Sequence, residues 1–154
     1  QFPQMRIVGT TRRAEMGEQL HVAGYSDIVT ETNGTLDTEE QYDRILDLVG
    51  PSAIKDSMQH LRCGGVLCST GQLGGKWFLE EFDPIVDLAE DAYLTSFYSG
   101  NVSAERLREM FDYIEQYAVP VQPERVFSLS ETADAHRWLE GQNGFGKAVV
   151  LVQK

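Results

Sequence analysis

Two short apolar runs in the middle of the chain end in residues that suit ligand binding. The run Ile45–Val49 leads into a Gly-Pro pair, and the run Gly65–Ser69 leads into Thr70-Gly71. Glycine lets a ligand approach the backbone closely, and hydroxyl groups donate and accept hydrogen bonds. The same residue types also suit ordinary strand-to-helix turns. If the pattern marks a cofactor site, its candidate residues are Gly50, Ser69, Thr70 and Gly71.

The segment between these runs has the length and spacing of one helix. Ile54, Met58 and Leu61 fall at i, i+4 and i+7 within Pro51–Leu61, so they form one apolar stripe. Strand, crossover helix and strand make a βαβ unit, whose parallel strands are buried on both faces. In open parallel sheets a ligand sits just beyond the carboxyl ends of the strands. The glycine and hydroxyl residues therefore stand where a ligand is expected.

Strands and helices alternate along the rest of the chain, which predicts an α/β doubly wound, mostly parallel sheet. Further strands are predicted at Met5–Thr10, Asp27–Thr30, Ala92–Tyr98, Val126–Leu129 and Lys147–Val152. Helices are predicted at Ala14–Ala23, from the N-cap Ser103 onward, and at Glu131–Glu140 after the N-cap Ser130, with a helical turn at Thr38–Gln41. The buried face of the Ser103 helix is predicted to carry Leu107, Met110, Phe111, Ile114 and Tyr117.

Composition excludes several classes of function. The chain has 154 residues, enough for one domain, and its 13 basic against 24 acidic residues give a net charge of −11. Such a surface repels nucleic acids and anionic membranes. There is neither an apolar run of about 20 residues nor the layout of a secretory signal at the start. Cys63 and Cys68 fit no zinc pattern, so we expect no metal site and two buried, reduced thiols in a cytoplasmic protein.

Four segments, in this order, carry a family likeness: Ile7–Arg12, Ile45–Gly50, Gly64–Gly71 and Val126–Leu151. Together they resemble the nucleotide-binding domain of the medium-chain dehydrogenase/reductase superfamily, which includes zinc-type alcohol dehydrogenases and quinone oxidoreductases, on its quinone-oxidoreductase side. The resemblance spans nearly the whole chain. It implies a Rossmann-like fold in which the four cofactor candidates line the ribose and nicotinamide end.

The same resemblance implies that residues 1–154 form a single, truncated NADP-binding domain. It lacks the family's first βα unit with its G-x-G-x-x-G turn, and the N-terminal GroES-like catalytic domain. The missing first strand would lie in the middle of the Rossmann sheet. Its loss should leave a gap with exposed apolar surface and unpaired backbone groups. Either the sheet rearranges or another chain fills the slot.

The end of the first predicted strand bears on cofactor choice. NAD-binding Rossmann domains carry Asp or Glu at the corresponding position, which holds the ribose 2′-hydroxyl. This chain has Thr10, Thr11 and Arg12 there. Hydroxyls and a forked guanidinium suit a 2′-phosphate, which favours NADP. The alternative is that Arg12 and Arg13 simply decorate the first turn of a helix.

The resemblance implies the cofactor-binding domain of an NADP(H)-dependent oxidoreductase that passes hydride to a quinone or an enone-type carbonyl substrate. The alternatives are a non-catalytic Rossmann-like dimerisation module and a domain of a zinc-dependent alcohol dehydrogenase. The family pairs subunits through the strand that corresponds to Ala92–Tyr98, which implies a homodimer. We expect this chain alone to be inactive and assign no catalytic residue.

The remaining polar candidates are expected to be structural. His21, His60 and His136 fall on predicted helices, away from strand ends. Asp47 lies inside an apolar strand, where its carboxylate needs a partner, so we expect it to accept a structural hydrogen bond.

Overall fold

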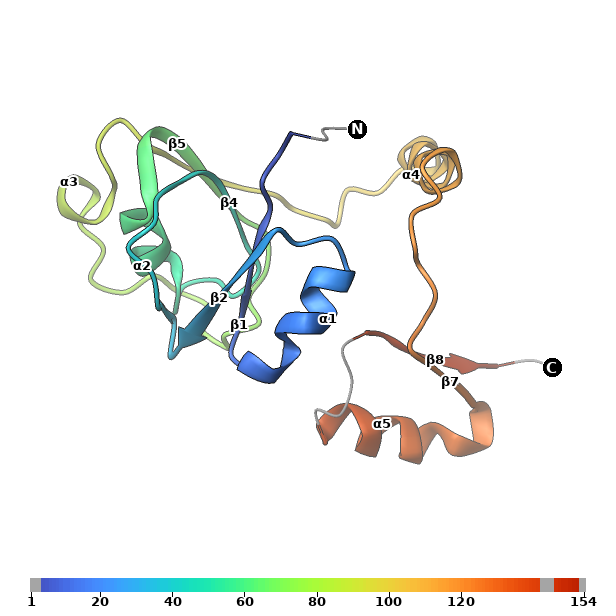
Figure 1. Cartoon of the computed structure of the whole chain (residues 1–154). Coiled ribbons are helices and arrows are strands. Elements are labelled where there is room, and N and C mark those ends of the chain that lie inside the picture. Colours follow the sequence, from blue (N-terminus) through green and yellow to red (C-terminus); the bar gives the residue numbers. More distant parts are fainter. Residues whose placement is uncertain (1–3, 142–145, 153–154) are drawn as a thin grey trace. The chain divides into compact units, whose positions relative to one another are not determined.

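The computed structural model describes residues 4–141 and 146–152, and the chain forms two compact units (Figure 1). The first unit is Gln1–Asn101 and the second is Val102–Lys154. Apart from one antiparallel hairpin, the described strands pair in parallel and are joined by helices. The fold is therefore of the α/β, Rossmann-like class that the sequence predicts.

The first ladder of the Gln1–Asn101 unit joins β1 to β2 in parallel and β2 to β3 as a hairpin. The bounds are β1 Val8–Thr11, η1 (a 3-10 turn) Ala14–Met16, α1 Gly17–Val22, β2 Asp27–Thr32 and β3 Thr35–Leu36. Met16 and Leu20 are buried. The chain turns at Asn33-Gly34, a pair typical of tight turns, with left-handed φ of 54° and 86°.

The second ladder of this unit has the strand order β4-β5-β6, and all of its pairs are parallel. The bounds are β4 Tyr42–Asp47, α2 Ile54–Gln59, β5 Leu61–Ser69, α3 Pro84–Asp87 and β6 Tyr93–Ser96. Asp47 pairs with Ser69, and Ser69 pairs with Ser96. The three strands therefore end level with one another, which brings the loops that follow them to one edge.

The core of the first unit lies between α2 and the second ladder. Ile54, Met58, Leu61 and Leu67 are buried against one another. The predicted apolar stripe is confirmed, but the helix is shorter than predicted and Leu61 belongs to β5. The helix stops because the backbone turns to pair with β4, where Tyr42 N donates to the carbonyl of His60 at 2.7 Å.

The two ladders of the first unit are separate, as the sequence-based expectation of a gap requires. Within the described residues β1 pairs only with β2, and β4 pairs only with β5. Met5 and Ile7 are exposed, contrary to the predicted buried strand, because no strand covers them on this side. On β4, Leu46 is exposed as well.

Side chains and one hairpin hold the two ladders together. Arg6, just before β1, forms ion pairs with Asp27 at 2.6 Å and with Glu40 at 2.9 Å. Hydrogen bonds to these two carboxylates raise the pKa of Arg6. At the other end of β2, the hairpin packs on α2, where Leu36 N donates to Asp56 Oδ2 at 2.9 Å. The starts of β1 and β2 and the segment before β4 therefore lie near Arg6.

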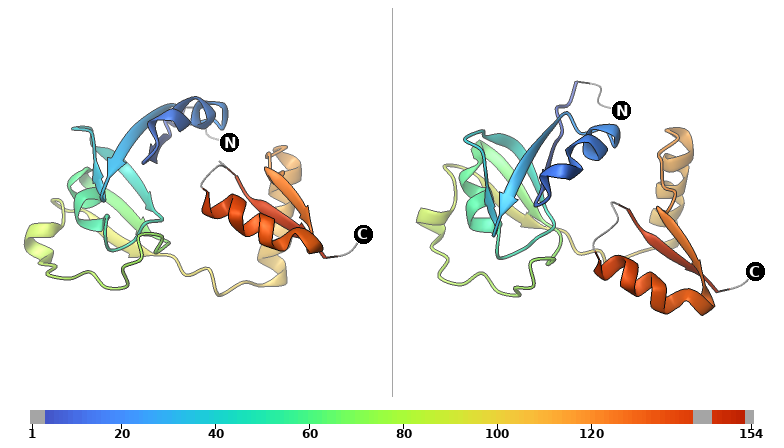
Figure 2. Two further views of the ribbon diagram at one scale, coloured as in Figure 1. Left: turned by 90° about the horizontal axis from the view of Figure 1, so that it is seen from below. Right: turned by 60° about the horizontal axis from the view of Figure 1, so that its bottom comes forward.

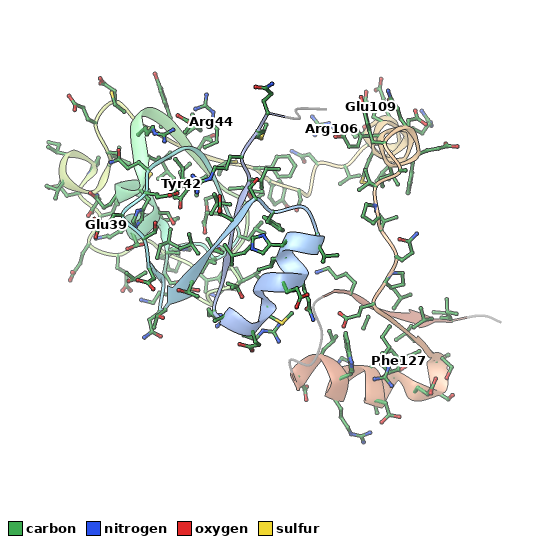
Figure 3. The ribbon with its side chains drawn as sticks, viewed as in Figure 1. Glu39, Tyr42, Arg44, Arg106, Glu109 and Phe127 are labelled. Atoms are coloured by element: carbon green, nitrogen blue, oxygen red, sulfur yellow. The ribbon has the colours of Figure 1, made fainter. Side chains whose placement is uncertain are left out.

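The Val102–Lys154 unit is a smaller βαβ arrangement preceded by a helix. The bounds are α4 Ala104–Gln116, β7 Arg125–Ser128, η2 Leu129–Glu131, α5 Thr132–Glu140 and β8 Ala148–Leu151. β7 and β8 pair in parallel, and α5 covers one face of this pair (Figure 2). The side chain of Phe127, on β7 (Figure 3), packs against Trp138 of α5. Their rings meet edge-on, with the centroids 6.4 Å apart.

The helix ends of this unit confirm one predicted cap and correct another. Ser103 caps α4 by accepting from Arg106 N at 3.2 Å, as predicted. The cap before α5 is Ser128, and the prediction of Ser130 was wrong. Ser128 and Glu131 form a capping box that starts a 3-10 turn before the helix. Hydrogen bonds from the side chain and then the backbone of Ser128 lower the pKa of Glu131.

Three further predictions were wrong. The apolar side chains of α4 are not buried: Met110 is 46% and Phe111 60% exposed, because no described element packs over them. Thr38–Gln41 forms no helical turn: the Thr38 side chain accepts from Glu40 N, and the segment has no regular structure before β4 begins. Cys63 is exposed at the irregular start of β5, while Cys68 is half-buried and both thiols are free.

No helix in the described part of the chain has both the length and the apolar character that a bilayer span needs.

Replacement of Met58 by alanine tests the position of the core. The side chain is fully buried, so Met58→Ala should lower the free energy of unfolding by about 2–5 kcal/mol through lost burial and a cavity. Met110→Ala is the matched control on an exposed helix face and should cost no more than about 0.5 kcal/mol. Urea denaturation followed by circular dichroism measures both. Similar losses for the two variants would contradict this core.

Candidate functional site

The loops that follow β4 and β5 are joined to each other by backbone hydrogen bonds. Thr70 N donates to the carbonyl of Asp47 at 2.7 Å. Leu73 N donates to the carbonyl of Leu48 at 3.1 Å, and Gly74 N to that of Val49 at 2.8 Å. These bonds continue the β4–β5 pairing past the ends of the strands. We call the joined segments 47–50 and 69–74 the carboxyl rim.

Glycines allow this close approach. Gly50 has a φ of 87°, and a Cβ added to it would lie 2.8 Å from the carbonyl oxygen of Gly71. A Cβ added to Gly71 would lie 2.5 Å from the carbonyl oxygen of Leu48. The sequence suggested that these glycines leave room for a ligand. In the structure the backbone of the facing loop takes the space beside each of them, so loop packing alone explains why both are glycine.

Asp47 links the two halves of the carboxyl rim from inside the protein. Its side chain is 4% exposed. Oδ1 accepts from Val49 N at 2.9 Å and from Gly50 N at 3.0 Å. Oδ2 accepts from Ser69 Oγ at 3.0 Å and from Gly50 N at 3.1 Å. The structural hydrogen-bonding role expected for this residue is confirmed.

The candidate hydroxyl groups lie on the rim beside these bonds. Ser69 and Thr70 are both half-buried. Ser69 donates to Asp47, and Thr70 Oγ1 donates to the carbonyl of Cys68 at 3.2 Å. The structure therefore brings Gly50, Ser69, Thr70 and Gly71 together, as their predicted positions at neighbouring strand ends imply.

The other candidates lie at the carboxyl end of β1, on the other ladder. Thr11 Oγ1 accepts from Arg13 N at 3.1 Å and lies 3.3 Å from the carbonyl oxygen of Arg13, so it shapes a local turn. Thr10 and Arg12 are exposed. Arg12 precedes η1, which begins at Ala14, so its guanidinium does not belong to the first turn of the helix. Among the described residues of the first unit, no hydrogen bond joins this strand end to the carboxyl rim.

Sequence reasoning missed a cavity of about 360 Å³ beside the start of α2. It is lined by Pro51, Ser52, Lys55, Lys76, Phe78, Leu79, Glu80 and Glu81. Lys55 is already paired, with Asp87 at 3.2 Å and with the carbonyl of Glu81. The sequence analysis also did not identify Gly74 as part of the rim, where it packs against Ser52 and Val49. The Gly74-Gly75 pair was the available signal, since paired glycines mark tight backbone turns.

The described residues provide no metal-ligand cluster, and two of the predicted histidines bond backbone carbonyls away from the site. Within residues 4–141 and 146–152, no group of three His, Cys, Asp or Glu side chains is arranged to hold a metal ion. The His21 ring bonds the carbonyl of Tyr25 at 3.0 Å, and His60 Nδ1 lies 3.1 Å from the carbonyl of Glu40. The carbonyl of His60 accepts from Tyr42 N at the amino end of β4, and Figure 3 labels Tyr42 on the first unit. The amino end of β4 is the end opposite the carboxyl rim.

Parallel strands with crossover helices, and glycine and hydroxyl residues at their carboxyl ends, define a Rossmann-like α/β class of protein. Sequence comparison identifies the family within this class. Residues 21–150 match the family described as zinc-binding dehydrogenase, and the chain belongs to that family. A search of curated protein sequences found no match.

Solved structures of this superfamily share the fold. An NAD-dependent alcohol dehydrogenase is 17% identical with a TM-score of 0.74, over 96% of this chain and 44% of its own. A mycobacterial protein complexed with NADPH is 22% identical with a TM-score of 0.75, over 96% and 49%. The quinone oxidoreductase from Coxiella burnetii is 19% identical with a TM-score of 0.69, over 96% and 45%. This chain thus spans less than half of each of these proteins.

Gly71→Ala tests whether the carboxyl rim depends on close backbone packing. The new Cβ would press on the Leu48 carbonyl, so the loops must separate, and we expect a loss of about 1–3 kcal/mol in unfolding free energy. Gly17→Ala is the control, because nothing lies within 4 Å of its added Cβ. Gly17 is helical, so alanine should be neutral or stabilising by up to about 1 kcal/mol. Chemical denaturation of both variants measures the difference, and an unchanged Gly71→Ala protein would refute the packing.

Proposed function

We propose that this chain is a nucleotide-binding domain of an NADP(H)-dependent oxidoreductase, and that the carboxyl rim and the end of β1 bind the dinucleotide. The observation that carries the proposal is the geometry of the rim. Two strand ends are locked together, and half-buried Ser69 and Thr70 stand on them where parallel sheets bind ligands. Membership of the zinc-binding dehydrogenase family supports the same conclusion.

The residues present fit the cofactor in two places. Ser69 and Thr70 offer oxygen lone pairs beside backbone turns at the rim. At the end of β1, Thr10 and Arg12 are exposed, and Arg12 has no ion-pair partner among the described residues. When bound, the nicotinamide ring supplies the hydride chemistry. The task of this chain is to hold and orient the dinucleotide.

The preference for NADP over NAD rests on the end of β1. A guanidinium binds a 2′-phosphate through charge-assisted hydrogen bonds, whereas an NAD site needs a carboxylate for the free 2′-hydroxyl. Thr10, Thr11 and Arg12 include no carboxylate, and Thr11 forms the turn that presents its neighbours. Among the similar structures, one is named as NAD-dependent and another was solved with NADPH. Local charge at Arg12 therefore carries the proposed choice.

For the parent reaction we propose hydride transfer to a quinone or an enone-type carbonyl compound. The similarity to a quinone oxidoreductase supports this substrate class. The described residues do not fit a zinc site, so we assign no zinc to this chain and derive no step from it. Catalytic residues are likewise not assigned to this domain.

A second role, as a dimerisation module, is favoured by the outer strand β6. In the described ladder β6 pairs with β5 on one side only, and its other edge is open. Tyr93, Leu94, Phe97 and Tyr98 on this segment are all exposed, Tyr98 by 76%. An open, aromatic edge strand invites pairing with a second strand. We propose that two copies associate through Ala92–Tyr98, and this role is compatible with cofactor binding.

Thermal unfolding with nucleotides tests the cofactor proposal. NADPH at about 100 times its Kd should stabilise the chain by about 2.7 kcal/mol, which raises Tm by several degrees, and NADH should do less. Arg12→Ala should abolish the advantage of NADPH and leave the effect of NADH unchanged. Arg108→Ala, an exposed arginine on α4, is the control and should behave like the unsubstituted chain. Equal stabilisation by both nucleotides, insensitive to Arg12, would refute the NADP preference.

Light scattering after size exclusion tests the dimer. The unsubstituted chain should give twice the chain mass of 17.3 kDa at high concentration. Leu94→Lys should shift the protein toward monomer, because like charges would oppose each other across the paired edges. Val149→Lys, on β8 in the second unit, serves as a control for an added lysine and should leave the mass unchanged. A monomer at high concentration would overturn the dimer but not nucleotide binding.

A further inference from the structure

The hydroxyl groups at the end of β5 have their single protons committed to oxygen acceptors of the protein. Ser69 Oγ lies 3.0 Å from Asp47 Oδ2, and Thr70 Oγ1 lies 3.2 Å from the carbonyl oxygen of Cys68. A carboxylate oxygen and a carbonyl oxygen only accept hydrogen bonds, so each hydroxyl must donate. Each side-chain oxygen is then left with lone pairs alone for any further partner.

The direction of the Ser69 bond is fixed by the surroundings of Asp47. Its carboxylate is buried and surrounded by donors: the N–H groups of Val49 and Gly50 and the hydroxyl of Ser69. Backbone N–H groups donate only, so they hold the carboxylate oxygens as acceptors. Ser69 is the one partner in this set that could either donate or accept a hydrogen bond. Because the carboxylate oxygen that it faces only accepts, the Ser69 hydroxyl donates to it.

We infer that Asp47 makes Ser69 a hydrogen-bond acceptor toward the ligand, so that the carboxyl rim selects a hydrogen-bond donor of the dinucleotide. This inference rests on the proposed function. Nicotinamide dinucleotides offer three kinds of uncharged donor: the carboxamide NH₂, the adenine NH₂ and the ribose hydroxyls. Phosphate and carboxylate oxygens are acceptors, and they would meet lone pairs on Ser69 with the Asp47 carboxylate directly behind. Asp47 is thus a positioning residue that sets specificity without touching the ligand.

An asparagine at position 47 should reverse this polarity while keeping the local shape. Oδ1 of Asp47 already accepts from both backbone amides, at 2.9 and 3.0 Å, and the amide oxygen of asparagine can keep these bonds. The second contact of Gly50 N, with Oδ2 at 3.1 Å, is lost. The NH₂ group then replaces Oδ2, which faces Ser69 Oγ at 3.0 Å. Because NH₂ donates, Ser69 must accept from it, and the hydroxyl proton becomes available to the ligand.

The experiment compares two ligands by calorimetry: NADP and nicotinic acid adenine dinucleotide phosphate, which carries a carboxylate in place of the carboxamide. The proteins are the full chain and its Asp47→Asn, Ser69→Ala and Asp43→Asn variants. Asp43 is the matched control, an aspartate on the same strand whose exposed side chain pairs with Arg62 at 2.8 Å. Ser69→Ala leaves the bonds from Asp47 to the backbone amides intact, so it tests the idea even if Asp47→Asn folds poorly.

The expected result is that the unsubstituted chain and Asp43→Asn bind the carboxamide form about 10-fold more tightly than the acid, and that Asp47→Asn reduces this ratio to about twofold or less. Equal binding of the two forms, with both weakened about 3- to 10-fold by Ser69→Ala, would also support the inference and would identify a ribose hydroxyl or the adenine NH₂ as the donor. Dissociation constants and ratios unchanged in Asp47→Asn and Ser69→Ala would overturn it. If the unsubstituted chain binds neither ligand, the proposed function fails, and this inference fails with it.

Discussion

The buried carboxylate of Asp47 is the constraint on which the candidate site depends. A carboxylate taken out of water needs hydrogen-bond donors, because burial without them costs several kcal/mol. Here the donors are the amides of the turn after β4 and the hydroxyl of Ser69 after β5. Satisfying one side chain therefore fixes two loops against each other. The glycines at positions 50 and 71 then let the backbones come close enough to bond directly.

The break between the two ladders sets the other condition on this fold. Neither β1 nor β4 has a strand partner on its second side among the described residues, so strand pairing does not join the two halves of the sheet. Arg6 and the β2–β3 hairpin provide the connection through ion pairs and contacts with α2. Exposed ion pairs contribute little each, typically about 0–1 kcal/mol. The two strand ends proposed to share one dinucleotide therefore lie on ladders that are linked through side chains and not through strand pairing.

The proposed binding residues form two chemically different regions. Arg12 at the end of β1 offers a cation and suits a phosphate, whereas Ser69 and Thr70 at the carboxyl rim offer lone pairs and suit a donor. A dinucleotide has matching groups at its two ends, a 2′-phosphate on the adenosine side and a carboxamide on the other. In the proposed complex, this difference in polarity would give the ligand a direction on the protein. It would do so in a chain whose net charge of −11 would otherwise repel an anion.

Features that depend on neighbouring residues were determined by the sequence itself. Periodicity and local backbone chemistry account for the apolar stripe of α2, the Asn33-Gly34 turn and the Ser103 cap. The same reasoning assigned four residues to neighbouring strand ends: Gly50, Ser69, Thr70 and Gly71. Only the tertiary structure decided what those residues do. The partner of Asp47 is Ser69, which the β4–β5 register brings opposite it. The apolar stripe of α4 shows the same limit, since periodicity predicts an apolar face and only packing determines whether an element covers it. Long-range register and packing are properties of the whole fold, and no local pattern encodes them.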